Sequence, residues 1–493
     1  MTAHVHVLDG TVELTRAEIG GKAYSINEMR RVGLPVPPAF VLPTAQCAVY
    51  REAGDRISTE VWEHVTEAIA GLEAATGRTF GAGPAPLLLS VRSGAAESMP
   101  GMMDTVLNLG LNEDLVVALA DASGDEEWAQ DTWHRFIESY ATIVAGDPAA
   151  RPPRDPWEQL RAAIGAVFLS WESPRAVAYR KRHGLDGLSG TAVTVQAMVF
   201  GNRDADSGTG VLFSRNPSTG EAQVTGDWLA RAQGEEVVSG SRTPETLDAF
   251  AASHQELHQD LIRIAALVEH ELHDMADIEF TVESGRLHVL QSRVGKRSPA
   301  AAVRIAVELV REGVIDREEA VRRLSDEHVA RLAETNSADA SAPVLARGTG
   351  IGTGVASGIA VTDVDEAEDR AMAGEDVVLV RGMTAPDDVP AMFQSVAVVT
   401  ETGGPTSHAA LVCREIGLPC VVGCGTGTIA ALVGKQITVD GTSGLIYEGA
   451  ADVGTASVDA HLAELLAYVD WPLPEGHTLA PLAHLAATIE VGR

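Results

Sequence analysis

Apolar residues along the first 300 positions follow two different spacings. Short apolar runs at 86–94, 191–200 and 286–293 have the length and the β-branched composition of strands. Residues 125–145 instead place apolar side chains at helical spacing. This alternation predicts one α/β region over residues 1–299.

The pattern changes after residue 299. Residues 300–332 have helical spacing with a single glycine, which predicts a helical hairpin, and the small polar residues at 333–343 end in proline and predict a linker. Short apolar runs separated by glycines predict a compact strand-rich domain at 344–451. The tail at 452–493 holds one helix-like stretch, AHLAELLAYV, which we expect to close that domain rather than to dock a partner. The predicted class is a multidomain protein of α/β and α+β type.

The charge of the chain limits its partners. With 37 Lys and Arg against 69 Asp and Glu, the formal net charge is −32, which disfavours binding to nucleic acid or anionic membranes. The N-terminus has no signal-peptide pattern, and no apolar run is long enough to span a membrane. We therefore expect a cytoplasmic protein whose four cysteines are reduced thiols.

Two glycine-containing stretches offer groups that bind phosphate. In IGGKAYSINEM (19–29), Gly20 and Gly21 make a tight turn from which Lys22 can reach a phosphate, although such a turn is often only structural. In SVRSGAAESMPGMMDTVLNLG (90–110), Arg92 ends a strand and a loop around Gly101 follows. That loop either covers phosphates with its N–H groups or packs its methionines as a plug.

A third stretch, MADIEFTVESGRLHVLQSRVGKR (275–297), predicts a hairpin. Asp277 and Glu279 alternate along its first strand and so share one face, and Gln291 and Arg293 repeat this geometry on the returning strand. Two carboxylates on one face are stabilised by a cation such as Mg²⁺ with a triphosphate. The alternative is a solvated face with cross-strand ion pairs.

These stretches, together with SGTGVLFSRNPSTGE (207–221), resemble in order the ATP-grasp nucleotide-binding region of the pyruvate, phosphate dikinase family. That family also carries a phosphorylatable histidine in a GG-x-TSHAA motif, and residues 403–410 read GGPTSHAA. The resemblance implies ATP and phosphate as substrates and Mg²⁺ as the metal. It implies roles in phosphate, metal and nucleotide binding for Lys22, Arg92, Gly101, Asp277, Glu279, Gln291 and Arg293.

The motif at 403–410 suits a nucleophilic imidazole. A neutral ring has a free lone pair, and the small neighbours of His408 leave room for a phosphoryl group. Thr406 or Ser407 is a natural N-cap for the helix AALVCREIG, whose N-terminus favours an anion. We therefore take His408, Thr406 and Arg92 as the candidate catalytic residues, against the alternative of a histidine that only packs or caps.

The resemblance also implies a reaction sequence. The histidine takes the β-phosphoryl group of ATP and leaves AMP, the γ-phosphoryl group passes to phosphate as pyrophosphate, and the histidine domain swings about the linker at 333–343 to phosphorylate pyruvate to phosphoenolpyruvate. The family's pyruvate site lies on a (β/α)₈ barrel of about 250 residues. Residues 452–493 are too few for one, so we expect a separate barrel-bearing chain as acceptor.

The sequence departs from the family pattern at several points. Position 227 is Asp and position 231 is Arg, where the family more usually has Glu and Asn, and the segment at 140–171 is short. CREIGLPCVVG leans toward relatives that use water or no co-acceptor, whereas the loop at 98–103 favours phosphate. Two other hypotheses stay open: a histidine autokinase with a different small-molecule acceptor, and a non-catalytic ATP-binding sensor. The absence of an inserted acceptor domain between 300 and 344 argues against the first, and the intact charged residues and His408 argue against the second.

Overall fold

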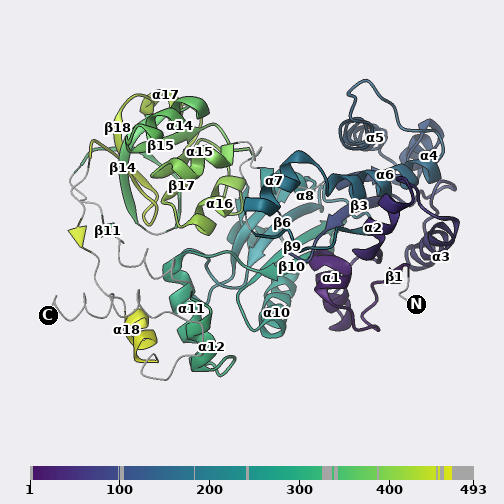
Figure 1. Ribbon diagram of the computed structural model, residues 1–493, viewed down its shortest axis with the longest axis horizontal. Helices are drawn as coiled ribbons and strands as arrows, with labels where there is room; N and C mark the ends of the chain where they lie inside the picture. The colour runs from purple at the N-terminus through teal and green to yellow at the C-terminus, as the bar shows by residue number, and fades with distance from the viewer. Residues whose placement is uncertain are drawn as a thin grey trace. The chain divides into compact units, whose positions relative to one another are not determined.

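The computed structural model describes residues 4–97, 99, 105–182, 184–239, 242, 244–324, 336–337, 342–352, 354–385, 388–450, 454–455 and 460–468. The chain divides into two compact units, one made of Met1–Ser207 with Thr281–Ser292 and the other of Gly208–Phe280 with Arg293–Arg493. Helices and several separate sheets alternate along it (Figure 1), which confirms the predicted mixed, multidomain class. The predicted region 1–299 contributes to both units.

The first unit contains a five-stranded antiparallel sheet. Val91 and Val195 are cross-strand partners on its apolar face and belong to a large hydrophobic core. The next pair, Arg92 and Thr194, therefore lies on the opposite face. In sheet order, the strands are β1 (His6–Val7), β2 (Ala39–Leu42), β5 (Ala192–Ala197), β3 (Leu89–Gly94) and β4 (Thr105–Leu109). The strands predicted within 191–200 and 86–94 are confirmed as β5 and β3.

Several helices of the first unit begin at side chains that cap them. Ser58, Asn112 and Asp125 each accept a hydrogen bond from a backbone N–H of the following first turn. The helix predicted at 125–145 is confirmed, and its last turn, Tyr140–Ala145, is a π-helix. The α-helices are α1 (Arg16–Arg31), α2 (Ala45–Glu52), α3 (Thr59–Thr76), α4 (Glu113–Ser123), α5 (Glu126–Ser139), α6 (Pro156–Ser170) and α7 (Pro174–Arg182).

A second five-stranded sheet begins the second unit, and the tip of its β9–β10 hairpin is assigned to the first. The glycines of the 207–221 stretch have a packing role here, since a Cβ on Gly208 would lie 2.2 Å from Trp228 and one on Gly210 would lie 2.4 Å from Phe280. In sheet order, the strands are β10 (Arg286–Val294), β9 (Ala276–Glu283), β6 (Gly208–Phe213), β7 (Thr225–Ala230) and β8 (Glu245–Thr246). The helices beside them in sequence are α8 (Gly234–Ser239), α9 (Leu247–Ser253) and α10 (Gln255–Leu272).

Three helices of the second unit, two directly after its first sheet and one near residue 460, pack against one another. The predicted hairpin appears as α11 (Pro299–Arg311) and α12 (Arg317–Arg322), while 325–335 lies outside the described residues. The tail helix α18 (Ala460–Ala467) shares an apolar cluster with both. In the described part of the chain it packs there, so the expectation that it closes the domain at 344–451 is not met. Within the predicted linker, β11 (Asn336–Ser337) pairs with β20 (Gly454–Thr455).

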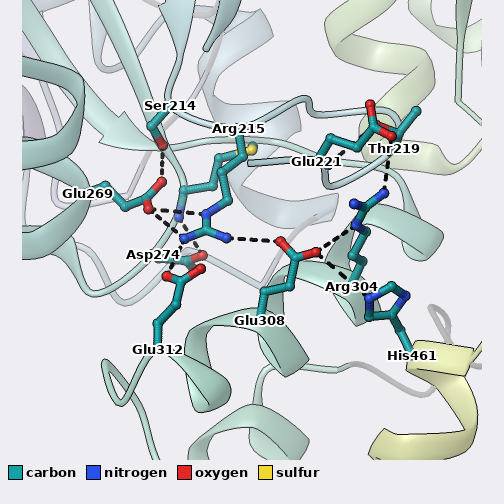
Figure 2. A network of polar contacts seen from close by, with 11 residues as sticks. Ser214, Arg215, Thr219, Glu221, Glu269, Asp274, Arg304, Glu308, Glu312 and His461 are labelled. Carbon is teal, nitrogen blue, oxygen red and sulfur yellow. Dashed lines mark hydrogen bonds and ion pairs between the residues drawn. The ribbon is translucent and has the colours of Figure 1, made fainter. Parts of the chain in front are cut away.

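A buried arginine ties these helices to the sheet before them. The guanidinium of Arg215 contacts Glu269 on α10 at 2.8 Å, and Glu308 and Glu312 of the α11 region at 3.1 and 2.6 Å (Figure 2). The side chain of Arg215 is only 4% exposed, so these carboxylates take the place of water around its charge. The result is a polar joint between α10 and α11.

The remaining domain is an eight-stranded sheet whose centre is parallel. Strands β14, β15, β16 and β17 run parallel, so the carboxyl ends of β15 and β16 lie at one edge, where Arg381 pairs with Thr400. Apolar clusters cover both faces, which explains the uninterrupted apolar runs. In sheet order, the strands are β12 (Val344–Arg347), β19 (Leu445–Glu448), β18 (Gln436–Asp440), β14 (Val355–Val361), β15 (Val377–Arg381), β16 (Ala397–Thr400), β17 (Cys420–Val422) and β13 (Thr349–Ile351). The helices are α14 (Val364–Met372), α15 (Val389–Gln394), α16 (His408–Ile416) and α17 (Thr428–Leu432).

Cysteine chemistry agrees with the sequence-based expectation. All four cysteines are free thiols, and Cys47, Cys413 and Cys420 are buried. Burial raises the pKa of Cys420 well above its ordinary value, and Cys413 beside it raises that pKa further. Cys420 is therefore a protonated packing group rather than a nucleophile.

Candidate active site

His408 lies at the edge of the sheet where the parallel strands β15 and β16 end. The loop after β16 leads through GGPTS into α16, of which His408 is the first residue and Ser407 the N-cap. Gly403 has φ +106°, and a Cβ there would lie 2.9 Å from that of Ser407. The glycine therefore permits the sharp turn that aims the start of α16 back over this edge. The carboxyl ends of parallel strands are where open α/β sheets usually bind ligands.

One nitrogen of the His408 ring is held by a neighbouring loop. Nδ1 lies 2.9 Å from Oγ1 of Thr384, which follows β15, and among the described residues no hydrogen bond is recorded for Nε2. The ring is half-buried, less open than the motif alone suggested. This burial lowers the pKa of His408 below 6.5, while the nearby carboxylate of Asp388 raises it. The ring is therefore neutral at physiological pH, with Nε2 as its open nitrogen.

The N-terminus of α16 carries an unsatisfied hydroxyl. The prediction that Thr406 or Ser407 caps the helix is half right, because Ser407 is the N-cap but its side chain makes no capping bond. Its Oγ is buried and has no hydrogen-bond partner among the described residues. An orphaned hydroxyl beside a helix N-terminus and His408 suits a phosphoryl oxygen.

Thr406 has a different role from the predicted cap. Its backbone N–H and its hydroxyl both donate to Oδ2 of Asp227 on β7, at 2.9 and 2.6 Å. Both residues are almost fully buried, and burial raises the pKa of Asp227, while the two bonds from Thr406 lower it. Asp227, noted in the sequence as a departure from the family, thus holds the histidine loop against the second sheet.

Arg414 lies under the same contact, one turn and a half along α16. Its guanidinium is fully buried, donates to the carbonyl oxygen of Pro405 and lies over the Phe213 ring at 5.4 Å. Burial lowers its pKa to about 10, and the carboxylates of Asp227 and Asp277 oppose that shift. The arginine supplies positive charge beneath a pair of buried acids.

Asp277 has the features of a metal ligand. It is fully buried on β9; Arg293 on β10 donates from Nε to its Oδ2 at 2.8 Å, and its Oδ1 has no partner among the described residues. Burial raises the pKa of Asp277, and Arg293 lowers it. Glu279, two residues along β9, is half-buried on the same face. An orphaned carboxylate oxygen next to a second carboxylate fits Mg²⁺, which takes one or two carboxylates together with phosphates.

The other predicted phosphate-binding residues belong to the first unit. Arg92 on β3 donates to Oε1 of Gln291 on β10 at 3.5 Å. Lys22 follows a kink in α1 at Gly20, which has φ +76° and would place a Cβ 2.1 Å from the carbonyl oxygen of Gly94. Gly21 donates to the carbonyl oxygen of Ala95 at 2.8 Å. The two glycines thus fix Lys22 beside the end of β3, and Gly101 lies outside the described residues.

The structure therefore assembles the predicted residues in two groups. Arg92, Gln291 and Lys22 gather in the first unit, and Asp277, Glu279, Arg293, Thr406 and His408 belong to the second. Sequence reasoning missed Thr384, Asp388 and Arg414. Two features of the sequence could have pointed to these residues. One is the polar turn TAPDD directly after an apolar strand, and the other is the single arginine inside the apolar helix of the histidine motif.

Comparison with known families supports this arrangement. A family model described as "Pyruvate phosphate dikinase, AMP/ATP-binding domain" matches residues 53–259, and one described as "PEP-utilising enzyme, mobile domain" matches residues 373–444. The chain thus resembles a domain of the first kind followed by one of the second. None of the described helices is long and apolar enough to cross a membrane.

Whole proteins similar to this chain are pyruvate, phosphate dikinases. The chain is 39% identical to pyruvate, phosphate dikinase of Mesembryanthemum crystallinum, covering 92% of this chain and 54% of that one. It is 39% identical to that of Rhizobium meliloti (94% and 59%) and 37% identical to that of Clostridium symbiosum (92% and 58%). The predicted resemblance to the pyruvate, phosphate dikinase family is confirmed, and the chain spans somewhat more than half the length of these relatives. A solved structure titled as an NMR structure of Enzyme I matches 20% of this chain at 26% identity with a TM-score of 0.14, which is too low to bear on the fold.

Proposed function

We propose that this chain is the ATP-dependent, histidine-phosphorylating part of a pyruvate, phosphate dikinase-type phosphotransferase. ATP and phosphate phosphorylate His408 and give AMP and pyrophosphate, and the phosphoryl group then passes to pyruvate to make phosphoenolpyruvate. The observation that carries this proposal is the His408 ring, which is neutral, held at Nδ1 by Thr384 and open at Nε2. Similarity over 92% of the chain to pyruvate, phosphate dikinases supports it.

The first chemical step needs little from the protein beyond position and charge. Nε2 attacks the β-phosphorus of ATP, an N–P bond forms, and the P–O bond to the α-phosphate breaks with its electron pair leaving on AMP. Phosphate then takes the γ-phosphoryl group as pyrophosphate, and His408 keeps the β-phosphoryl group. The N-terminus of α16 and the Ser407 hydroxyl are placed to stabilise that group.

The predicted binding residues have separate roles toward the nucleotide. Lys22 and Arg92 neutralise phosphate charge, and Gln291 and Arg293 orient the β- and γ-phosphates. Asp277 and Glu279 would hold Mg²⁺, which neutralises charge on the phosphates when it is bound. Gly101 belongs to the loop that we expect to cover the phosphates.

The second half-reaction uses the histidine-bearing domain as a carrier. The β11–β20 pair brings together the two chain segments that flank this domain, which supports its movement as one body about a single point. Pyruvate accepts the phosphoryl group on a (β/α)₈ barrel, and a barrel-bearing protein supplied in trans is the acceptor that we propose. Transfer to another small molecule, or no transfer at all, is the alternative outcome of the test below.

The test is single-turnover labelling with [β-³²P]ATP and Mg²⁺, with and without phosphate. We expect an acid-labile phosphoprotein, AMP, phosphate-dependent pyrophosphate, and no label on a His408→Asn variant. Discharge of the label by pyruvate, with barrel proteins of the family added in trans, identifies the acceptor. ATP binding without any AMP would overturn the proposal in favour of a sensor. Release of the γ-phosphoryl group as inorganic phosphate, with no pyrophosphate formed, would make water the co-acceptor.

A further inference from the structure

The turn between β15 and α15 is built around a buried ion pair. Asp388 is 4% exposed, and its two oxygens lie 3.2 and 3.3 Å from the guanidinium of Arg381. The same carboxylate accepts the backbone N–H of Ala385 at 3.0 Å, and Arg381 donates to the carbonyl oxygen of Thr362 at 2.9 Å. These four bonds fix the two ends of the turn, in whose described part Thr384 contacts the His408 ring.

Thr384 connects this turn to the nucleophile. It precedes Ala385, is 5% exposed, and its Oγ1 lies 2.9 Å from Nδ1 of His408. Among the described charged groups on the elements around the ring, Asp388 and Arg381 belong to this turn. Glu401 after β16 accepts from the backbone of α17, and Arg414 of α16 directs its guanidinium to Pro405. Asp388 is the one whose charge acts on the His408 ring.

The direction of the Thr384–His408 bond decides which nitrogen can react. If the hydroxyl donates to Nδ1, the ring proton sits on Nε2 and blocks attack there. If Nδ1–H donates to the hydroxyl oxygen, Nε2 keeps its lone pair. A nearby anion favours the second arrangement, because it stabilises an N–H on the side of the ring that faces it, and it favours the ring cation left after Nε2 is phosphorylated. No proton then has to move during the N–P bond-forming step.

We propose that Asp388 is a positioning residue for phosphoryl transfer: with Arg381 it holds the Thr384 turn against His408 and keeps the ring proton on Nδ1, so that Nε2 is the nucleophile. This role rests on the proposed function of His408. It adds to that function a residue that touches neither the nucleotide nor the phosphoryl group.

The test compares Asp388→Asn with wild type in the full chain. Asparagine keeps an oxygen for the Ala385 N–H but removes the charge. The matched control is Glu366→Gln, which removes one carboxylate from an exposed Arg370 pair on α14 of the same domain. Nitrogen-15 NMR of histidine-labelled protein reports the protonation of each ring nitrogen, and His408 is identified by the signal lost in His408→Gln. The rate of labelling by [β-³²P]ATP is measured in parallel, and thermal unfolding confirms that each variant is folded.

Asp388→Asn is expected to shift ring protonation toward Nε2–H and to lower the pKa of His408 further. The maximal rate of labelling should fall by about 10- to 100-fold, while the KM for ATP should stay unchanged. That range is found when the hydrogen-bonding partners of metal-ligating histidines are removed. Glu366→Gln should match wild type in both measurements. Unchanged tautomer and pKa in a folded Asp388→Asn protein overturn the proposal. The NMR measurement does not depend on phosphorylation. If the wild-type protein were not labelled, the function of His408 would be refuted, but the NMR spectra would still show whether Asp388 controls the ring proton.

Discussion

Replacing Asp227 by alanine tests the contact that holds the histidine loop on β7. The substitution removes the acceptor of two hydrogen bonds from Thr406, at 2.9 and 2.6 Å, and takes a carboxylate from beside Arg414. Asp227→Asn is the matched control, because it keeps an oxygen at the same place and loses only the charge.

The size of the effect follows from these two bonds. Hydrogen bonds to a charged group contribute about 1.5–3 kcal/mol each, or about 3–6 kcal/mol together. The cost of burying the carboxylate, which also raises the pKa of Asp227, offsets part of this. A net loss of about 2–3 kcal/mol weakens the contact by roughly 30- to 150-fold. Asp227→Asn should weaken it several-fold at most, because amide oxygens accept the same bonds without the charge.

The assay separates this contact from the chemistry of His408. Labelling by [β-³²P]ATP should slow by roughly 30- to 150-fold in Asp227→Ala at subsaturating nucleotide, since the rate follows the population of the contact. Discharge of a preformed phosphoprotein to pyruvate should keep its wild-type rate, because Asp227 has no part in that step. Wild-type labelling by a folded Asp227→Ala protein would refute the reasoning, and equal losses in the alanine and asparagine variants would show that charge rather than hydrogen bonding holds the loop.

Three further predictions concern pH, backbone and charge. Because burial lowers the pKa of His408, labelling should reach half its maximal rate only below pH 6.5, the ordinary value. A half-maximal rate above pH 6.5 would contradict this. Gly20→Ala places a Cβ 2.1 Å from the Gly94 carbonyl oxygen, at a residue whose φ is +76°. We expect the free energy of unfolding to fall by at least about 1–3 kcal/mol and ATP binding, measured by calorimetry, to weaken. An unchanged denaturation midpoint would argue against this. Arg215→Met leaves three glutamates facing one another and should cost about 3–5 kcal/mol in chemical denaturation, whereas Arg322→Gln, at an exposed pair, should cost under about 1 kcal/mol. Equal effects of these two arginine substitutions would count against a structural role for the buried joint.

Elements with strong local patterns could be predicted from the sequence. The apolar runs VVLV and VAVV are buried on both faces of a parallel sheet, so they contain no polar residue that could obscure their length. The histidine motif was equally readable, because a glycine turn, small residues and a helix start are all local features.

Long-range pairings could not be predicted in the same way. Nothing local to Asp227 shows that Thr406, 179 residues away, donates to it, and nothing in AHLAELLAYV shows that its apolar face meets α11 instead of the domain before it. The sequence could not decide whether Thr406 or Ser407 caps α16, for a related reason. Both residue types can cap a helix, and it is the distant carboxylate of Asp227 that accepts the hydrogen bonds of Thr406. Thr384 was missed because a threonine in a polar turn has no local signal until the turn is set beside the ring.

The central claim is that Nε2 of His408 carries the phosphoryl group. Phosphorus-31 and nitrogen-15 NMR of protein treated with ATP, Mg²⁺ and phosphate, with peptide mapping of the same sample at alkaline pH, tests it most directly. We predict one phosphorylated residue, His408, bonded through Nε2 and with Nδ1 protonated. A phosphoryl group on any other residue, or on Nδ1 of this ring, would contradict the claim.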